Sequence, residues 1–247
     1  MYYRRWEAHL AFRETLSMYT HLFFDIDHTL WDFETNSEKA LEGVYEAERL
    51  AEKGIPDFND FNLVYHAIND KLWERFRKGF LSREDLRWKR MWQTLMHYRV
   101  PDEVQAKRMS ELYLELLPQQ RTLFPHAVET LSYLQGKGYS MHLITNGFEA
   151  TQHQKLQNAG IQGYFDKMIT SEAAMSIKPQ AAIFHYALRE AGATAATSVM
   201  IGDAWEIDIL GARDVGMAQV FFNPKGLVVE EKPTFEIQCL SELIQLF

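Results

Sequence analysis

In HLFFDIDHT, residues 21–29, a short apolar run leads directly into two aspartates and a threonine, and this pattern is the strongest indication of the fold. Such a run, bounded by polar residues, predicts a buried strand at His21–Phe24. Four later runs have the same character, and helical patterns separate most of them: Met141–Ile144, Lys167–Ile169, Ser198–Ile201 and Gln219–Phe222. Alternation of strand and helix predicts an α/β protein with a doubly wound parallel sheet and helices on both faces, a Rossmann-like core.

Three helices are predicted between these strands, at Glu149–Ala159, Gln180–Ala191 and Trp205–Asp214. The second has Pro179 at its entry and Gly192 at its exit. Proline fits the first turn of a helix and glycine fits the residue after its end, so both positions agree with the predicted bounds.

Residues 34–117 have a different pattern, with helical periodicity, many charges and no good strand. We expect an all-helical cap inserted after the first strand. Its clearest helical stretches are Ser37–Leu50, Asn62–Lys78 and Arg83–Tyr98. The catalytic core is then 18–33 and 118–247. Residues 118–124 return the chain to the core, and Pro125 is expected to begin the next helix. Residues 1–17 are read as an N-terminal extension.

Composition excludes several classes of protein. The chain has 247 residues, 47% of them hydrophobic, and a formal net charge of −8. A general nucleic-acid coat needs a basic surface, so no nucleic-acid partner is expected. The single cysteine, Cys239, allows neither an intramolecular disulfide nor a cysteine-cluster metal site. Apolar runs too short to span a bilayer predict no membrane partner, and we expect a cytoplasmic protein.

Polar side chains gather at the predicted carboxyl ends of the strands, where doubly wound sheets place their functional groups. These ends and the loops beside them supply carboxylates, a hydroxyl, an amide and an ammonium. The candidate site residues are Asp25, Asp27, Thr145, Asn146, Lys178, Asp203 and Asp208.

Each residue type suits one part of phosphate chemistry. Asp25 and Asp203 can hold a hard divalent cation, and Mg²⁺ suits so sparse a set of oxygen ligands. Once the cation and Lys178 offset the charge of a phosphate, a carboxylate can attack it and form an aspartyl phosphate. Thr145 and nearby amides can hold the phosphoryl oxygens. Asp27 can protonate the leaving alkoxide and then activate water.

The ordered motifs resemble those of the haloacid dehalogenase-like hydrolase superfamily. They are DxDxT at Asp25–Thr29, hhhTNG at Met141–Gly147, KP at Lys178–Pro179 and GDxxxxD at Gly202–Asp208. The insert after the first motif resembles the cap of the helical-cap branch. Within that branch, residues 25–33 and 145–148 look most like the noncanonical-pyrimidine 5′-nucleotidase group.

The resemblance implies a role for each candidate. Asp25 is the nucleophile and Asp27 the acid and base. Mg²⁺ binds to Asp25, to the main-chain carbonyl of Asp27 and to Asp203. The phosphate is held by Thr145, Asn146 and Lys178, and Asp208 anchors either the metal shell or Lys178.

The expected function is therefore Mg²⁺-dependent hydrolysis of a phosphomonoester through an aspartyl phosphate, with a small phosphorylated metabolite, a nucleoside 5′-monophosphate, as substrate. A phosphoglycolate phosphatase, a sugar-phosphate phosphatase and a phosphomutase are alternatives. Two others fit less well. A metal-free haloacid dehalogenase has no use for Asp27 and Asp203. A signalling receiver has its metal-binding acids on the first strand and its phosphoacceptor on a later one.

Overall fold

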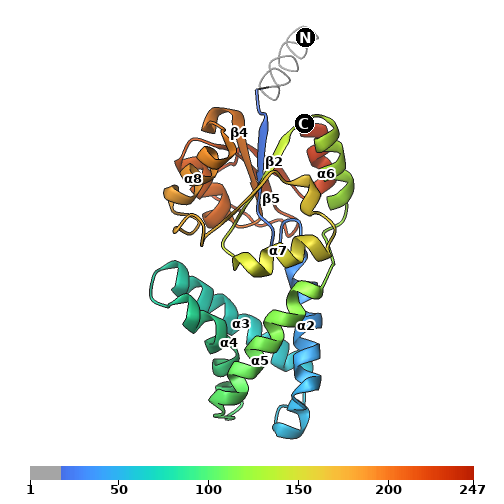
Figure 1. Ribbon diagram of the computed structural model, residues 1–247, viewed down its shortest axis with the longest axis vertical. Helices are drawn as coiled ribbons and strands as arrows, with labels where there is room; N and C mark the ends of the chain where they lie inside the picture. The colour runs from blue at the N-terminus through green and yellow to red at the C-terminus, as the bar shows by residue number, and fades with distance from the viewer. Residues whose placement is uncertain (1–17) are drawn as a thin grey trace. The chain divides into compact units, whose positions relative to one another are not determined.

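The computed structural model describes residues 18–247, so the predicted extension at 1–17 lies outside the described residues. The described chain divides into two units (Figure 1). One is Phe33–Arg121, and the other, the core unit, combines residues 18–32 with 122–247. The first unit begins one position before the predicted insert 34–117 and ends four positions after it.

The core unit is built on one parallel sheet. Its strand order is β3-β2-β1-β4-β5-β6, and every adjacent pair runs parallel. The strands are β1 His21–Phe24, β2 Ser140–Thr145, β3 Lys167–Thr170, β4 Ser198–Gly202, β5 Ala218–Phe222 and β6 Phe235–Ile237. The predicted doubly wound parallel sheet is confirmed, and β6 is an addition that the sequence pattern did not indicate.

The register of β1 places the first motif at the centre of the sheet. Phe24, the last residue of β1, pairs with Leu143 of β2 on one side and with Ile201 of β4 on the other. The N–H of Asp25 then donates to the carbonyl of Ile201 at 2.9 Å. The ends of β1, β2 and β4, which carry the predicted site residues, are therefore held side by side.

Helices flank this sheet, with α6 and α8 on opposite sides of it in Figure 1. The α-helices of the described core are α6 Ala127–Gly136, α7 Glu149–Asn158, α8 Ala181–Ala191, α9 Leu210–Asp214 and α10 Leu243–Leu246. Short 3₁₀ turns lie at Gln162–Tyr164, Ala195–Thr197 and Leu240–Glu242. Apolar residues of α8, including Ile183 and Phe184, pack in one buried cluster with Phe23 and Met200 of the sheet. Such burial is the main source of stability for a sheet of this kind.

Two predicted helix bounds need correction. The first helix after the insert, α6, begins at Ala127 rather than at the predicted Pro125, because His126 has a φ of 66° and is outside the helical region. The predicted helix Trp205–Asp214 begins as a π-helical turn, Trp205–Ile209, and only Leu210–Asp214 is α-helical.

The helical unit contains α2 Phe33–Ala47, α3 Phe58–Arg77, α4 Arg83–His97 and α5 Glu103–Leu116, with 3₁₀ turns at Leu50–Lys53 and Leu117–Gln119. Polar caps set three of the starts. The side chains of Asp57, Ser82 and Asp102 accept N–H groups from the first turns of α3, α4 and α5. The cap at Asp57 starts α3 four residues before the predicted Asn62.

Glu48, at the end of α2, ties that helix to α5. Its carboxylate accepts two hydrogen bonds from Arg108, both at 2.6 Å, and one from Gln105 at 3.2 Å. Lys53 adds a longer contact at 3.3 Å. The Arg108 hydrogen bonds hold the pKa of Glu48 below its usual value, against the opposing effect of burial.

The chain leaves and re-enters the core at adjacent points. The N–H of Asp32 donates to the carbonyl of Thr122 at 3.1 Å, and the N–H of Phe124 donates to that of Leu30 at 2.9 Å. In the described part of the chain, no helix is long and apolar enough to cross a membrane.

Candidate active site

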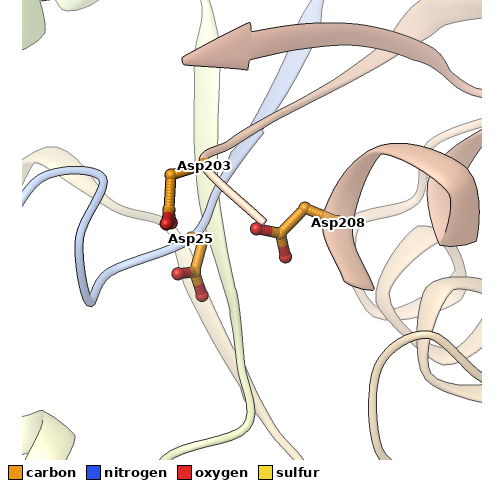
Figure 2. A group of neighbouring side chains, drawn as sticks. All are labelled: Asp25, Asp203 and Asp208. Atoms are coloured by element: carbon orange, nitrogen blue, oxygen red, sulfur yellow. The ribbon is translucent and has the colours of Figure 1, made fainter. Parts of the chain in front are cut away.

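Three carboxylates from two separated motifs meet beyond the sheet. Asp25 follows β1, Asp203 follows β4, and Asp208 lies in the π-helical turn after it. One oxygen from each lies within 4.8 Å of the others, and Figure 2 shows the three side chains turned toward a common space. Asp25 and Asp208 are buried. Because buried carboxylates repel one another, such a group needs positive charge nearby.

Lys178 supplies part of that charge. Its Nζ donates to Asp25 Oδ1 at 2.5 Å and to Asp208 Oδ1 at 2.7 Å, and its side chain is 2% exposed. Burial lowers the pKa of Lys178, but the two carboxylates outweigh burial and raise it, so the side chain is an ammonium at neutral pH. The predicted convergence of Asp25, Asp208 and Lys178 is therefore observed in the structure.

Both carboxylate oxygens of Asp208 accept hydrogen bonds from protein groups. While Oδ1 accepts from Lys178, Oδ2 accepts the N–H of Ala204 at 3.1 Å. A Cβ at Gly202 would lie 2.4 Å from Asp208 Oδ2, so this approach requires glycine at that position. Of the two roles foreseen for Asp208, this geometry supports the anchoring of Lys178.

Asp203 is held by the first motif. The hydroxyl of Thr29 donates to Asp203 Oδ1 at 3.0 Å, and the N–H of Asp203 donates to Thr29 Oγ1 at 3.1 Å. Burial, followed by the charge of Asp208, raises the pKa of Asp203 to about 6. Burial also raises the pKa of Asp25, against the opposing effect of Lys178, and the charges of Asp208 and Asp203 raise it further.

The donor set fits a hard divalent cation. Three carboxylates face one ammonium. Burial is the main cause of the raised pKa values of Asp25 and Asp203, and the charges of the neighbouring carboxylates add to it. Carboxylate oxygens are the ligands that Mg²⁺ takes in proteins. Since both oxygens of Asp208 accept hydrogen bonds, Asp25 and Asp203 are the candidate carboxylate ligands. The predicted contact of the Asp27 main-chain carbonyl with the metal stays a prediction.

The loop between Asp25 and Thr29 is a tight turn around one carbonyl. The oxygen of Ile26 accepts the N–H groups of Leu30 at 3.0 Å and Trp31 at 2.9 Å. His28 has a φ of 66°, a left-handed conformation that lets the chain reverse. This turn brings Thr29 back toward Asp203, a role that the predicted motif did not specify.

Thr145, at the end of β2, has a fixed hydroxyl. Its Oγ1 accepts the N–H of Gly147 at 3.0 Å and the Nε2 of Gln152 at 2.8 Å. The hydroxyl hydrogen is thus left to be donated elsewhere, as a phosphoryl-binding role requires. A Cβ at Gly147 would lie 2.3 Å from Gln152 Nε2, so the glycine makes room for the glutamine.

The side-chain amide of Asn146 hydrogen-bonds to the main chain of Lys178 through both its oxygen and its nitrogen. Its Oδ1 accepts the N–H of Lys178 at 2.8 Å, and its Nδ2 donates to the carbonyl of Lys178 at 3.1 Å. The side chain therefore fixes the loop that presents the ammonium. The predicted phosphate contact of Asn146 stays a prediction.

Two residues of α7 donate hydrogen bonds to the carboxylate of Asp27. Lys155 Nζ donates to Asp27 Oδ1 at 2.6 Å, and Gln152 Nε2 donates to Asp27 Oδ2 at 2.8 Å. Burial raises the pKa of Asp27, but Lys155, with help from Gln152, lowers it more, so the resting group is a carboxylate. The carboxylate is the form that a general base needs.

Gln152 and Lys155 were not among the predicted site residues. They share the buried face of α7 with Leu156, at helical spacing. The sequence places both residues on the same helical face as the apolar Leu156, and this spacing was the available signal. Their burial, which the structure shows, marks them as important because buried polar groups need specific partners.

Comparisons with known proteins agree with this fold and these motifs. The family model "haloacid dehalogenase-like hydrolase" matches residues 19–216. The crystal structure of the HAD-hydrolase YfnB from Bacillus subtilis, bound to magnesium and described as revealing interdomain movement, is similar with a TM-score of 0.84 and 28% identity. The match covers 92% of this chain and 98% of YfnB.

Two relatives of known activity are similar over most of their length. The pyrimidine 5′-nucleotidase YjjG of Escherichia coli is 32% identical, covering 91% of this chain and 96% of YjjG. The ribulose-1,5-bisphosphate 5-phosphatase of Halopiger xanaduensis is 30% identical, covering 84% and 86%. From the family match, the motifs and the shared fold, the chain belongs to the haloacid dehalogenase-like hydrolase family.

Proposed function

We propose that the protein is a Mg²⁺-dependent phosphomonoesterase that acts on a nucleoside 5′-monophosphate. The observation that carries the reaction type is the buried cluster in which Asp25 lies 2.5 Å from Lys178 and within 4.8 Å of Asp203. It combines a nucleophile, an ammonium and a second oxygen ligand in one place.

The first step is transfer of the phosphoryl group to Asp25. An oxygen of the Asp25 carboxylate attacks phosphorus, and the bond from phosphorus to the leaving oxygen breaks. Bound Mg²⁺ supplies positive charge that, with Lys178, offsets the charge of the phosphate. The Thr145 hydroxyl donates to a phosphoryl oxygen. A protonated Asp27 gives its proton to the leaving alkoxide, so the resting carboxylate must take up a proton before this step.

The second step regenerates the enzyme. Asp27, now a carboxylate, takes a proton from a water molecule as that water attacks the aspartyl phosphate. The bond from phosphorus to the Asp25 oxygen breaks, inorganic phosphate leaves, and Asp25 is again a carboxylate. Lys155 and Gln152 favour the carboxylate form of Asp27, which suits it to this step.

Similarity to YjjG supports a nucleotide substrate. Similarity to the ribulose-1,5-bisphosphate 5-phosphatase makes a sugar phosphate the second candidate. The test is phosphate release with Mg²⁺ from nucleoside 5′-monophosphates, sugar phosphates and phosphoglycolate. We expect nucleoside monophosphates to have the highest kcat/KM. A higher value for a sugar phosphate would replace the nucleotide assignment and leave the chemistry unchanged.

The chemistry has its own controls. EDTA and Asp25→Asn should each abolish release, whereas Asp214→Asn, at an exposed acid in α9, should not. Normal turnover by Asp25→Asn would exclude this nucleophile.

A phosphomutase would retain the phosphoryl group instead of releasing it over many turnovers. Halide release without metal would indicate a dehalogenase, and a long-lived phosphoprotein would indicate a signalling role.

A further inference from the structure

We propose that Lys155 and Gln152 are positioning residues, which hold the Asp27 carboxyl group in the orientation from which, once protonated, it gives its proton to the leaving group. The inference rests on the proposed phosphomonoesterase activity and names two residues of α7 that serve it. Neither residue lies in the four motifs that identify the family.

The contacts fix both oxygens of Asp27. One oxygen lies 2.6 Å from the ammonium of Lys155, and the other lies 2.8 Å from the amide nitrogen of Gln152. A carboxylate held at both oxygens from two directions has little freedom to rotate about its side-chain bonds. Proton transfer depends on such alignment, since a displacement of about 1 Å can cost about 10²-fold in rate.

Lys155 is itself held in place. Its side chain is 3% exposed, and its ammonium lies 4.2 Å from the centre of the Trp31 ring. A buried ammonium needs a partner, and the pair with Asp27 together with the face of Trp31 provides it. The side chain of Asp27 remains 25% exposed, so it is still open on one side while Lys155 is enclosed.

Gln152 links the acid to the phosphate-binding side of the site. The same Nε2 that donates to Asp27 also donates to Thr145 Oγ1 at 2.8 Å. The amide therefore sets the separation between Asp27 and the Thr145 hydroxyl. The close approach of Gly147, which has no Cβ, leaves the space that this arrangement requires. One side chain thus orients the group that meets the leaving oxygen and the group that meets the phosphoryl oxygens.

The role of Lys155 can be separated from a general structural role by the leaving group. An alkoxide, as from a nucleoside monophosphate, needs a proton as it departs, whereas the phenolate of p-nitrophenyl phosphate departs without one. The value of kcat/KM reports the steps through departure of the leaving group, so the later base role of Asp27 does not enter it.

We expect Lys155→Met to lower kcat/KM for the nucleoside monophosphate about 10- to 100-fold, and for p-nitrophenyl phosphate less than about 3-fold. Gln152→Leu should act in the same direction, with an added loss on both substrates through Thr145. Lys155→Arg should restore most of the lost rate. Lys137→Met is the matched control, because Lys137 also lies over an aromatic ring, that of Tyr133, but is exposed and outside the site.

A double-mutant cycle sharpens the test. If Lys155 acts through Asp27, then adding Lys155→Met to Asp27→Asn should cause no further difference between the two substrates. Equal losses on both substrates by Lys155→Met, or an undiminished effect in the Asp27→Asn background, would overturn the inference. Failure of the wild-type protein to release phosphate from either substrate would instead contradict the proposed function.

A crystal structure provides a readout that needs no activity. In Lys155→Met, the Asp27 side chain should leave the orientation in which it contacts Gln152, and in Lys155→Arg it should keep it. If Asp27 keeps its wild-type rotamer in both Lys155→Met and Gln152→Leu, the positioning role is wrong, whatever the kinetics show.

Discussion

Thr29 and Asp203 hydrogen-bond to each other in both directions, although they are far apart in the sequence. The hydroxyl of Thr29 donates to Asp203 Oδ1 at 3.0 Å, and the main-chain N–H of Asp203 donates to Thr29 Oγ1 at 3.1 Å. One hydroxyl therefore holds both the main chain and the side chain of a candidate metal ligand. The first motif contributes to the site through its threonine as well as through its aspartates.

Replacing Thr29 should test that link. In Thr29→Val, two hydrogen bonds are lost at a fully buried position, and we expect the free energy of unfolding to fall by about 1–3 kcal/mol. The Asp203 carboxylate would be less fixed, so the Mg²⁺ concentration that gives half-maximal phosphate release should rise. Thr29→Ser keeps the hydroxyl and serves as the control; an Mg²⁺ dependence shifted equally in both variants would contradict this account.

Lys178 should be essential for stability as well as for turnover. In Lys178→Met, the carboxylates of Asp25 and Asp208 lose a shared partner while staying buried, and urea unfolding in EDTA should show a loss of about 3–5 kcal/mol. Adding Asp208→Asn removes one of the stranded charges, so the double variant should be more stable than Lys178→Met alone. If the second substitution lowers stability further, charge is not the cause.

His142 should make the protein less stable in mild acid. Burial, then the charge of neighbouring His21, lowers the pKa of His142 from its ordinary 6.5 to about 4 in the folded state. The unfolded chain therefore binds the proton first. Stability should be full above the unfolded pKa, should fall as the pH drops from 6.5 toward 4, and should level off below that.

The size of this effect is measurable by urea unfolding. Between about pH 7.5 and about pH 5, wild-type protein should lose about 2 kcal/mol more than His142→Phe, which has no group to titrate there. Because each protein is compared with itself at two pH values, a constant packing difference cancels. Identical pH dependence in the two proteins would show that His142 titrates normally.

The carboxylate of Glu48 should stabilise the helical unit. It is 7% exposed and accepts two hydrogen bonds from Arg108, so Glu48→Gln should cost about 1–3 kcal/mol in the free energy of unfolding. Glu103→Gln breaks the pair with Lys107, in which both side chains are 53% exposed, and should cost less than about 0.5 kcal/mol. Similar losses in the two variants would mean that burial of Glu48 is unimportant.

The sheet could be predicted closely because its strands are short apolar runs with polar ends. The predicted strands at 21–24 and 198–201 agree with β1 and β4 within one residue. By contrast, β6 has three residues, only one of them buried, and gives too short a pattern to separate from a loop. The start of α6 depended on the left-handed backbone of His126, which a helical pattern does not reveal.

The candidate site was predicted where residues belong to the ordered motifs and was missed where they lie outside them. Asp25 and Asp203 follow strands, Lys178 lies in a later loop and Asp208 lies in the turn after β4, and these four residues do converge. Gln152 and Lys155 were not predicted, because a polar residue in an amphipathic helix is usually on the solvated face. Their importance depends on which face of α7 is buried, and only the folded chain defines that.

The paired main-chain contacts at the edge of the core have a consequence for the insert. Because Asp32 and Thr122 are hydrogen-bonded to each other, the two ends of the helical unit are held together within the core unit, independently of the helices between them. For the sheet, the whole segment is equivalent to a short connection of fixed span. Its length and content can therefore change between related proteins without altering the ends of β1 and the chemistry placed there.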